Sequence, residues 1–402
     1  MLIEFILALF VGILFGAITG LFPGIHINLV AAGLLSLVGK GIFGIDTLVL
    51  VVFVVAMAIT HTFLDFIPSI FLGAPEEDSF LAVLPGHELL KAGKGYEAVV
   101  LTLYGSLAGL GIVLIFSFIF VYFLEEIYLG VRILIPYILI FASLYLVFRE
   151  REFLISGTIF VLAGFLGLLS FNLPVQEPLL PLLSGLFGVS SLIVSLKSKT
   201  VIPKQEIVGL RKIKLKMKEF VSGFFGMGIA APLCSFLPGI GSGHAAVIGS
   251  EIGGEQDRRE FLFLVGGINT IVMALSFVTA FVIGKTRTGA SAAVFELLGS
   301  ITLSNLVLIL AVVFISGIIA FFAGIFMAKV FASNISRISY DKINLFVLGI
   351  LFVVNLVLTN WIGMIVLFTA SALGVFCILS GVRRIQLMGV LLVPTIVFYL
   401  VL

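Results

Sequence analysis

The amino-acid sequence predicts an all-α, polytopic integral membrane protein with about 10–12 spanning helices. Composition is the first observation: 61% of the 402 residues are hydrophobic and 11% are charged, whereas soluble domains carry about 25% charged residues. The mean hydropathy of +1.31 agrees with this. The second observation is a succession of apolar segments near the roughly 20 residues that a span needs. A soluble core has no use for so much apolar surface.

The lengths of these apolar segments predict where helices break. Segments 26–39 and 242–253 are too short to span, so we expect half-helices of re-entrant or broken elements there. Segment 297–330 is long enough for one strongly tilted helix or a broken pair. The other candidate spans are 3–22, 45–72, 96–123, 127–148, 153–171, 177–196, 219–237, 260–283, 344–360, 362–381 and 385–402.

Charge, cysteines and the N-terminus narrow the class further. The net charge of +2 resides in loops and gives no reason to expect a nucleic-acid partner. Cys234 and Cys377 lie in apolar segments, so we expect no disulfide framework. The first five residues contain no base, which indicates a retained first span rather than a cleaved signal peptide.

One polar stretch divides the chain near its middle. Residues 197–218 hold eight lysines and arginines against a lone Glu206, so the positive-inside rule places this stretch in the cytoplasm. We expect a first membrane repeat at 1–196, a basic cytoplasmic linker at 197–218 and a second membrane repeat at 219–402. We expect the basic side chains to act as an orientation signal and to contact lipid headgroups. The alternative is that they bind a specific regulatory partner.

Two pairs of similar segments suggest that the halves are internal repeats. Residues 20–32 resemble residues 235–247, and residues 70–83 resemble residues 281–294. The two matches occur in the same order at similar spacing. Parallel and inverted repeats both remain open, and the base-free start of the first half favours inversion.

The first matched pair carries a Pro-Gly turn in each half, at Pro23-Gly24 and at Pro238-Gly239. Proline interrupts a helix, and glycine permits the sharp turn that follows. In lipid such a break requires protein or water to satisfy the freed backbone groups. Two breaks in corresponding positions indicate a transporter's binding site, and the alternative is that each turn only ends a helix at the interface.

A helix that begins after such a turn presents unpaired N–H groups and a positive dipole end, which suits a carboxylate. We expect polar side chains near the breaks to complete the site. The predicted substrate-binding residues are Pro23, Gly24, His26, Asn28, Pro75, Ser79, Pro238, Gly239, Ser242, His244, Asn269, Thr286 and Arg287. No metal site or cofactor is expected, because the four histidines lack metal-ligand spacing and no nucleotide-binding motif occurs.

Asp65 is the clearest ionisable residue within an apolar run, and His61 lies four residues before it on the same helix face. Ionisable residues inside spans are costly and usually functional. The pair therefore predicts a coupling site for H⁺ or Na⁺, with an interfacial salt bridge as the alternative. Asn269 also has two interpretations, a ligand for ion or substrate and a hydrogen bond between helices.

These motifs resemble those of the large permease subunit of the tripartite tricarboxylate transporters, the TctA family. The resemblance rests on residues 16–25, 67–75, 84–93 and 237–241, in that order. The chain departs from the family where acidic residues 76–78 replace small polar ones, and it lacks an Asn-Asn stretch of the second half. The resemblance implies secondary transport with a small membrane subunit and an extracytoplasmic binding protein.

The sequence therefore predicts a secondary permease of a prokaryotic plasma membrane that moves a small organic anion, a carboxylate, by ion-coupled alternating access. It is not expected to be an enzyme, because HExxH, P-loop and G-x-S motifs are absent. A membrane-embedded enzyme acting on a lipid-linked substrate is the competing class, and a non-transporting scaffold is a further alternative. Two broken helices around a polar cavity would favour transport, whereas a converging acid–base pair would favour an enzyme.

Overall fold

The structure is a computed structural model that describes residues 2–22, 30, 46–73, 79–131, 133–175, 178–198, 202–237, 241–254, 257–337 and 340–401. All regular elements among these residues are helical. Ten described helices are long and apolar enough to cross a membrane. The prediction of an all-α polytopic membrane protein is confirmed.

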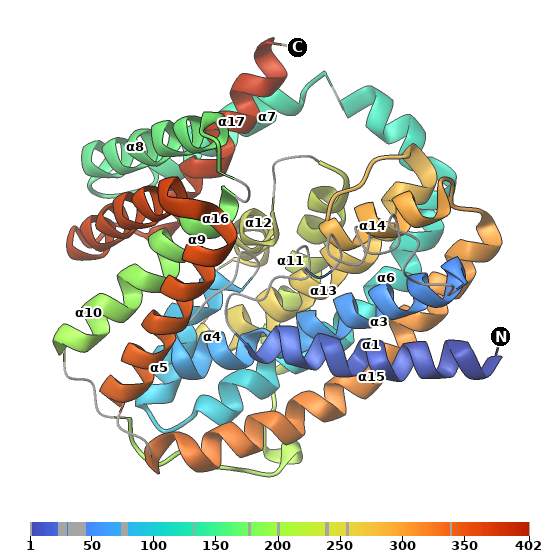
Figure 1. Cartoon of the computed structure of the whole chain (residues 1–402), viewed down its shortest axis with the longest axis horizontal. Helices are drawn as coiled ribbons and strands as arrows, with labels where there is room; N and C mark the ends of the chain where they lie inside the picture. Colours follow the sequence, from blue (N-terminus) through green and yellow to red (C-terminus); the bar gives the residue numbers. More distant parts are fainter. Residues whose placement is uncertain are drawn as a thin grey trace.

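The helices pack into two bundles, which we call the larger and the smaller bundle (Figure 1). The larger bundle contains α1 (Leu2–Leu21), α3 (Thr47–Leu64), α4 (Phe66–Leu72), η1 (Phe80–Ala82), α5 (Val83–Lys91), α6 (Gly95–Val131), α11 (Met217–Phe236), α12 (Ser242–Gly253), α13 (Arg258–Ile283), α14 (Gly289–Leu298) and α15 (Leu303–Asn334). The smaller bundle contains α7 (Ile135–Phe148), α8 (Phe153–Asn172), α9 (Leu179–Leu183), the π-helical η2 (Ser184–Val189), α10 (Ser190–Ser198), α16 (Tyr340–Leu379), η5 (Arg384–Met388) and α17 (Gly389–Val401). Each bundle thus takes one stretch from each half of the chain.

Helices α6 and α13 form the most extensive helix contact of the larger bundle. Glycines permit their close approach. A β-carbon at Gly105 would overlap the carbonyl oxygen of Phe263, and one at Gly266 would overlap the carbonyl oxygen of Thr102. Small residues at such crossings allow helices in membranes to pack backbone against backbone.

The directions of the packed helices show a pattern that spans both halves. α1 runs parallel to α3, and α11 runs parallel to α13, but α3 runs antiparallel to α13. α6 runs parallel to α13 and antiparallel to α15. Two contacts establish the direction of each pair. They are Gly12–Phe53 and Gly16–Met57 for α1 with α3, Gly223–Phe263 and Ser235–Thr279 for α11 with α13, Thr62–Thr270 and Asp65–Asn269 for α3 with α13, Gly105–Phe263 and Gly109–Ile271 for α6 with α13, and Leu103–Gly324 and Leu110–Gly317 for α6 with α15.

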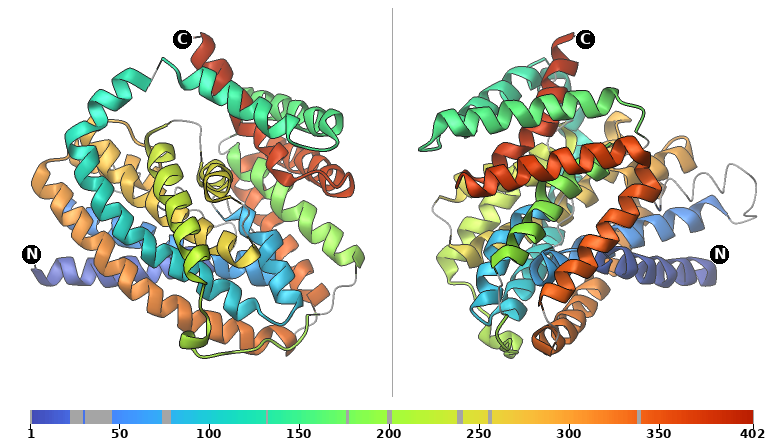
Figure 2. Two further views of the ribbon diagram at one scale, coloured as in Figure 1. Left: turned by 180° about the vertical axis from the view of Figure 1, so that it is seen from behind. Right: turned by 60° about the vertical axis from the view of Figure 1, so that its left-hand side comes forward.

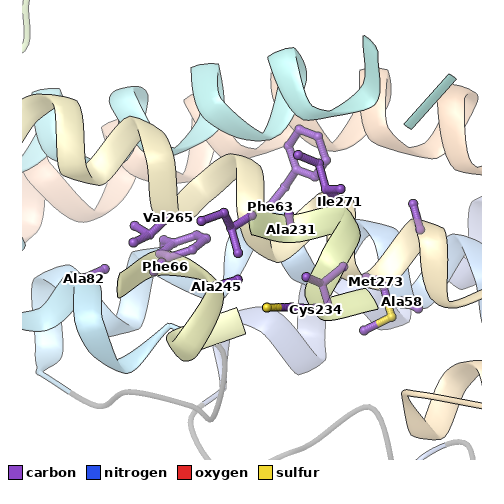
Figure 3. Close-up of a cluster of buried hydrophobic side chains, with 14 of the residues drawn as sticks. Ala58, Phe63, Phe66, Ala82, Ala231, Cys234, Ala245, Val265, Ile271 and Met273 are labelled. Carbon is purple, nitrogen blue, oxygen red and sulfur yellow. The ribbon is translucent and has the colours of Figure 1, made fainter. Parts of the chain in front are cut away.

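Helix α12 packs on α11 and α13 of the larger bundle, and its first residues are buried there. In Figure 3, Ala245 of α12 lies in one apolar cluster with Cys234 of α11, Met273 of α13, and Phe63 and Phe66. These side chains are nearly inaccessible to solvent. The cluster therefore holds α12 beside the α3–α4 junction.

The smaller bundle contains two departures from regular helix. Asn360 adopts φ 63° inside α16, which divides this helix into two arms that meet at a bend in the right-hand view of Figure 2. This break agrees with the predicted spans 344–360 and 362–381. In η2, Arg384 donates hydrogen bonds to the carbonyl oxygens of Leu186 (3.1 Å) and Phe187 (2.6 Å).

Two of the predicted membrane segments take a definite form in the structure. The predicted span 127–148 is wrong, because α6 continues to Val131 and α7 is only 14 residues long. The run 297–330 forms the single long helix α15, preceded by the short α14.

The basic linker, which includes the 3₁₀ turn η3 (Leu210–Lys212), is bound to the larger bundle through the side chain of Gln205. Its side chain accepts a hydrogen bond from the Gly95 N–H (2.7 Å) and donates one to the Leu90 carbonyl (3.0 Å).

We expect Gly105→Ala to lower the free energy of unfolding by about 1–3 kcal/mol, the usual cost of overpacking, because the new methyl group meets the α13 backbone. Gly111→Ala is the matched control in the same helix, since a β-carbon there meets nothing within 4 Å. Thermal unfolding of the detergent-solubilised variants measures both effects. Equal stability of the two variants would contradict this account of the crossing.

Candidate functional site

The first turn of α12 forms the candidate binding site in the second half. α11 ends at Phe236, and α12 begins at Ser242 with Gly241 as its N-cap. The first amide groups of a helix have no partner within the helix and face the positive end of its dipole. At α12 this end lies inside the larger bundle, where Ser242, Gly243 and His244 are buried.

Two side chains of this turn present buried polar atoms. His244 Nδ1 accepts a hydrogen bond from the Gly241 N–H at 3.1 Å. Because Nδ1 is the acceptor, the neutral ring carries its hydrogen on Nε2, which makes Nε2 a donor. His244 is 5% exposed and Ser242 is 3% exposed. Neither Nε2 of His244 nor Oγ of Ser242 has a hydrogen-bond partner among the described residues.

Arg287 brings a positive charge to the same turn. Its guanidinium Nε donates to the carbonyl oxygen of Cys234 at 3.1 Å. That carbonyl would normally accept from the N–H of residue 238 in the helix, but residue 238 is a proline and has none. A guanidinium nitrogen of Arg287 is also the nearest atom, at 3.9 Å, to a β-carbon built on Gly241. Arg287 therefore lies beside the start of α12.

The two buried atoms without a described partner, His244 Nε2 and Ser242 Oγ, can both donate a hydrogen bond, and the nearby charge is positive. An anion is the ligand that such a set accommodates. A carboxylate accepts several hydrogen bonds at once and carries no donor of its own when ionised. The neighbouring Lys285 points elsewhere, because its Nζ lies 5.0 Å from the ring centroid of Tyr128.

A second polar centre lies where α3 crosses α13. Asp65 is 1% exposed, and its Oδ2 accepts a hydrogen bond from Nδ2 of Asn269 at 2.8 Å. One turn away, the hydroxyl oxygens of Thr62 and Thr270 are 3.3 Å apart. The predicted coupling residue thus meets Asn269, which the sequence offered either as a ligand or as a hydrogen bond between helices, although 204 residues separate them in the chain.

The local sequence explains why Asp65 is at a junction. Pro68 cannot donate to the carbonyl of Leu64, and the helix is interrupted at Asp65, between α3 and α4. The carbonyl of Asp65 accepts a hydrogen bond from the Ser69 hydroxyl at 2.8 Å. Ser69 Oγ lies 2.6 Å from Ser79 Oγ, so a further predicted site residue belongs to this centre.

The remaining predicted residues are distributed differently. His61 Nδ1 lies 3.0 Å from the hydroxyl of Thr19 in α1, and Thr286 is exposed in the connection between α13 and α14. The following predicted residues lie outside the described part of the chain: Pro23, Gly24, His26, Asn28, Pro75, Pro238 and Gly239. In the described part, no group of three or more His, Cys, Asp and Glu side chains could hold a metal ion.

Beside the α4 end, His87 of α5 faces the smaller bundle. A β-carbon at Gly73 would lie 2.7 Å from Cε1 of His87. Burial lowers the pKa of His87 to about 4, and the positive charges of Lys91 and Arg384 act in the same direction. His87 is therefore neutral at physiological pH, which removes repulsion between α5 and the cation of η5.

Sequence reasoning missed the polar groups that join distant segments. Glu251, near the end of α12, pairs with Arg149 and accepts a hydrogen bond from the hydroxyl of Tyr145 at 3.3 Å. Sequence analysis assigned neither residue to the site. No local pattern marks an ion pair between segments about a hundred residues apart.

A family model described as the tripartite tricarboxylate transporter TctA family matches residues 6–389. An uncharacterised protein of Methanocaldococcus jannaschii is 31% identical over 418 residues, which cover 98% of this chain and 99% of that protein. No solved structure matches the chain.

We expect Asn269→Ala to destabilise the protein, because it removes a donor from a buried carboxylate at a cost of about 1–3 kcal/mol. Thermal unfolding in detergent measures this loss. In a double-mutant cycle, the Asp65→Ala, Asn269→Ala pair should cost less than the sum of the single variants. Strictly additive costs would show that the two side chains do not depend on each other.

Proposed function

Because the chain belongs to the tripartite tricarboxylate transporter TctA family, we propose that it is a secondary permease for a small organic anion of the carboxylate class. A cation gradient drives the uptake by alternating access. Family membership makes it a transporter subunit, and the nature of the anion and of the coupling ion is our proposal. The observation that carries it is the donor-lined, buried first turn of α12.

The anion binds at this turn by three kinds of group. Backbone N–H groups and the helix dipole favour negative charge at the start of α12. The Ser242 hydroxyl and His244 Nε2 supply donors that are buried and lack a partner among the described residues. Arg287 supplies the countercharge, and its bond to the Cys234 carbonyl orients the guanidinium.

Asp65 couples the cation in this proposal. A carboxylate at membrane depth is costly and is a functional candidate by default. Its position between α3 and α13 supports the role, because binding or releasing a cation there changes the charge at a helix crossing. Asn269 belongs to α13 and donates a hydrogen bond to Asp65, so a change of charge at Asp65 alters a contact of α13.

Alternating access uses the two halves as inverted repeats. The directions of the helices support this arrangement. The parallel pair α1 and α3 of the first half is antiparallel to the parallel pair α11 and α13 of the second half. α6 and α15 are opposed in the same way. Inverted repeats that place their broken helices at a shared site are a common construction of secondary transporters.

The family also suggests the setting. Its name implies a transporter of three components, so we propose that a small membrane subunit and an extracytoplasmic binding protein work with this chain. We place the chain in the plasma membrane of a prokaryote, with the linker 197–218 in the cytoplasm. The relative from Methanocaldococcus jannaschii supports a prokaryotic setting.

A carboxylate that binds the folded protein raises its unfolding temperature by mass action. We expect at least one member of a carboxylate panel, tested with and without sodium, to stabilise the purified wild-type protein. Arg287→Gln should weaken this binding about 10- to 100-fold, because it removes a charge-assisted hydrogen bond. Lys285→Gln is the matched control, two residues away on the face of Tyr128, and should bind as the wild type does. Equal effects of both variants would refute the α12 site.

We expect Asp65→Asn to abolish gradient-driven uptake into proteoliposomes while exchange of labelled for unlabelled anion continues. The substitution keeps the shape of the side chain and removes the charge that a cation can neutralise. Uptake and exchange are measured on the same vesicles. Unchanged gradient-driven uptake would remove Asp65 from the coupling mechanism.

A further inference from the structure

The packing differs sharply within and between the two bundles. Within the smaller bundle, a β-carbon at Gly167 would overlap the carbonyl oxygen of Val390, and one at Gly389 would overlap that of Phe160. The α6–α13 crossing of the larger bundle is equally close. Between the described helices of the two bundles, the most extensive contact is that of α4 with α16, and it is small by comparison. In the described part of the chain, each bundle is therefore tightly packed internally and has little contact with the other.

Charged and polar side chains bridge this boundary at the α7–α8 corner. Arg149, at the end of α7 in the smaller bundle, pairs with Glu251 of α12 in the larger bundle. Tyr145, one turn earlier in α7, donates to the other carboxylate oxygen of Glu251. The bridge is half-exposed, with side-chain exposures of 40% for Arg149 and 30% for Glu251.

We propose that the two bundles move against each other during transport, and that the contact of Glu251 with Arg149 and Tyr145 is the latch that closes one conformation and must open in the cycle. This inference rests on the proposed transport function and adds the moving boundary and its controlling residues. Glu251 acts as a positioning residue, because it touches neither the proposed anion nor the proposed cation.

Helix α12 links the latch to the site. Ser242 and His244 are in its first turn, and Glu251 is in its last turn. A 12-residue helix transmits displacement of one end to the other as a rigid rod, over roughly 18 Å. The hydrogen bond from the Ser222 hydroxyl to the Gly253 carbonyl (2.7 Å) also joins the end of α12 to α11. When the contact at Glu251 opens, the donor-lined turn therefore moves with the larger bundle relative to the smaller one.

Electrostatics explains why this contact suits a latch. The helix dipole destabilises a carboxylate near the C-terminal end of a helix. A cation supplied by another element therefore stabilises the charged form of Glu251. A half-exposed ion pair contributes little net stability. Such a pair can hold one arrangement without preventing the other, whereas backbone-to-backbone glycine packing cannot open and close at comparable cost.

The chain provides a matched control one residue away. Glu150 pairs with Arg383, and both residues belong to the smaller bundle. This pair has the same chemistry and the same α7–α8 corner as the latch, but it bridges no boundary. Changes at Glu150 should therefore affect the local structure without affecting movement between bundles.

Cross-linking tests the latch directly. Arg149→Cys, Glu251→Cys and the control pair Glu150→Cys, Arg383→Cys are linked with a short bifunctional thiol reagent in proteoliposomes; the native Cys234 and Cys377 are buried. We expect the 149–251 link to abolish carboxylate uptake, cleavage of the linker to restore it, and the 150–383 link to leave it intact. Full uptake with the 149–251 link in place, or equal loss with both links, would overturn the proposal.

A second measurement separates failure of the latch from failure of the proposed function, because it needs no substrate. Spin labels at exposed Met217 of the larger bundle and Leu154 of the smaller bundle report the distance between bundles. We expect Glu251→Gln to shift or broaden this distance distribution, and Glu150→Gln to leave it as in the wild type. An unchanged distribution in Glu251→Gln overturns the latch even if carboxylates are transported. A shifted one supports it even if no carboxylate in the panel binds.

Discussion

The interior of a bilayer offers no water to the polypeptide backbone, so each departure from regular helix must find its hydrogen-bond partners within the protein. Polar side chains in the described part of the chain meet that requirement at several such places. Arg287 satisfies the Cys234 carbonyl at the end of α11, and Arg384 satisfies two carbonyls of the π-helical η2. Where α16 breaks, the Asn360 side-chain oxygen accepts hydrogen bonds from the N–H groups of Ile362 and Gly363. The polar groups at the helix breaks thus have fixed positions because the surrounding lipid gives the backbone no alternative.

The same requirement shows what the sequence could and could not predict. The half-helix 242–253 was predicted with the bounds that the structure has, because glycines stand at both of its ends and its length is too short for a span. Segments 344–360 and 362–381 were also predicted as separate spans, and α16 breaks at Asn360 between them. The end of α6 was not predicted, because residues 124–131 contain no proline, and their one glycine, Gly130, lies within the helix. Local patterns reveal helix ends only where a residue prevents the helix from continuing.

Partners across the chain were beyond local patterns. Asp65 and Asn269 were each singled out as polar residues within apolar runs, but their hydrogen bond depends on the antiparallel crossing of α3 and α13. Arg149 and Glu251 are an example of the same kind. The composition of a helix face indicates that it is buried, while the identity of the facing residue follows only from the three-dimensional arrangement. Glycine contacts such as Gly105 with Phe263 decide that arrangement through shape.

The interleaving of the two halves has a consequence for biosynthesis. α7 to α10 leave the ribosome long before α16 and α17, yet they form one bundle with them. During that interval Gly167 and Gly185 have no Val390 or Ala370 to pack against, and their faces contact lipid or the insertion machinery. The smaller bundle therefore stays incompletely packed until α16 and α17 are inserted.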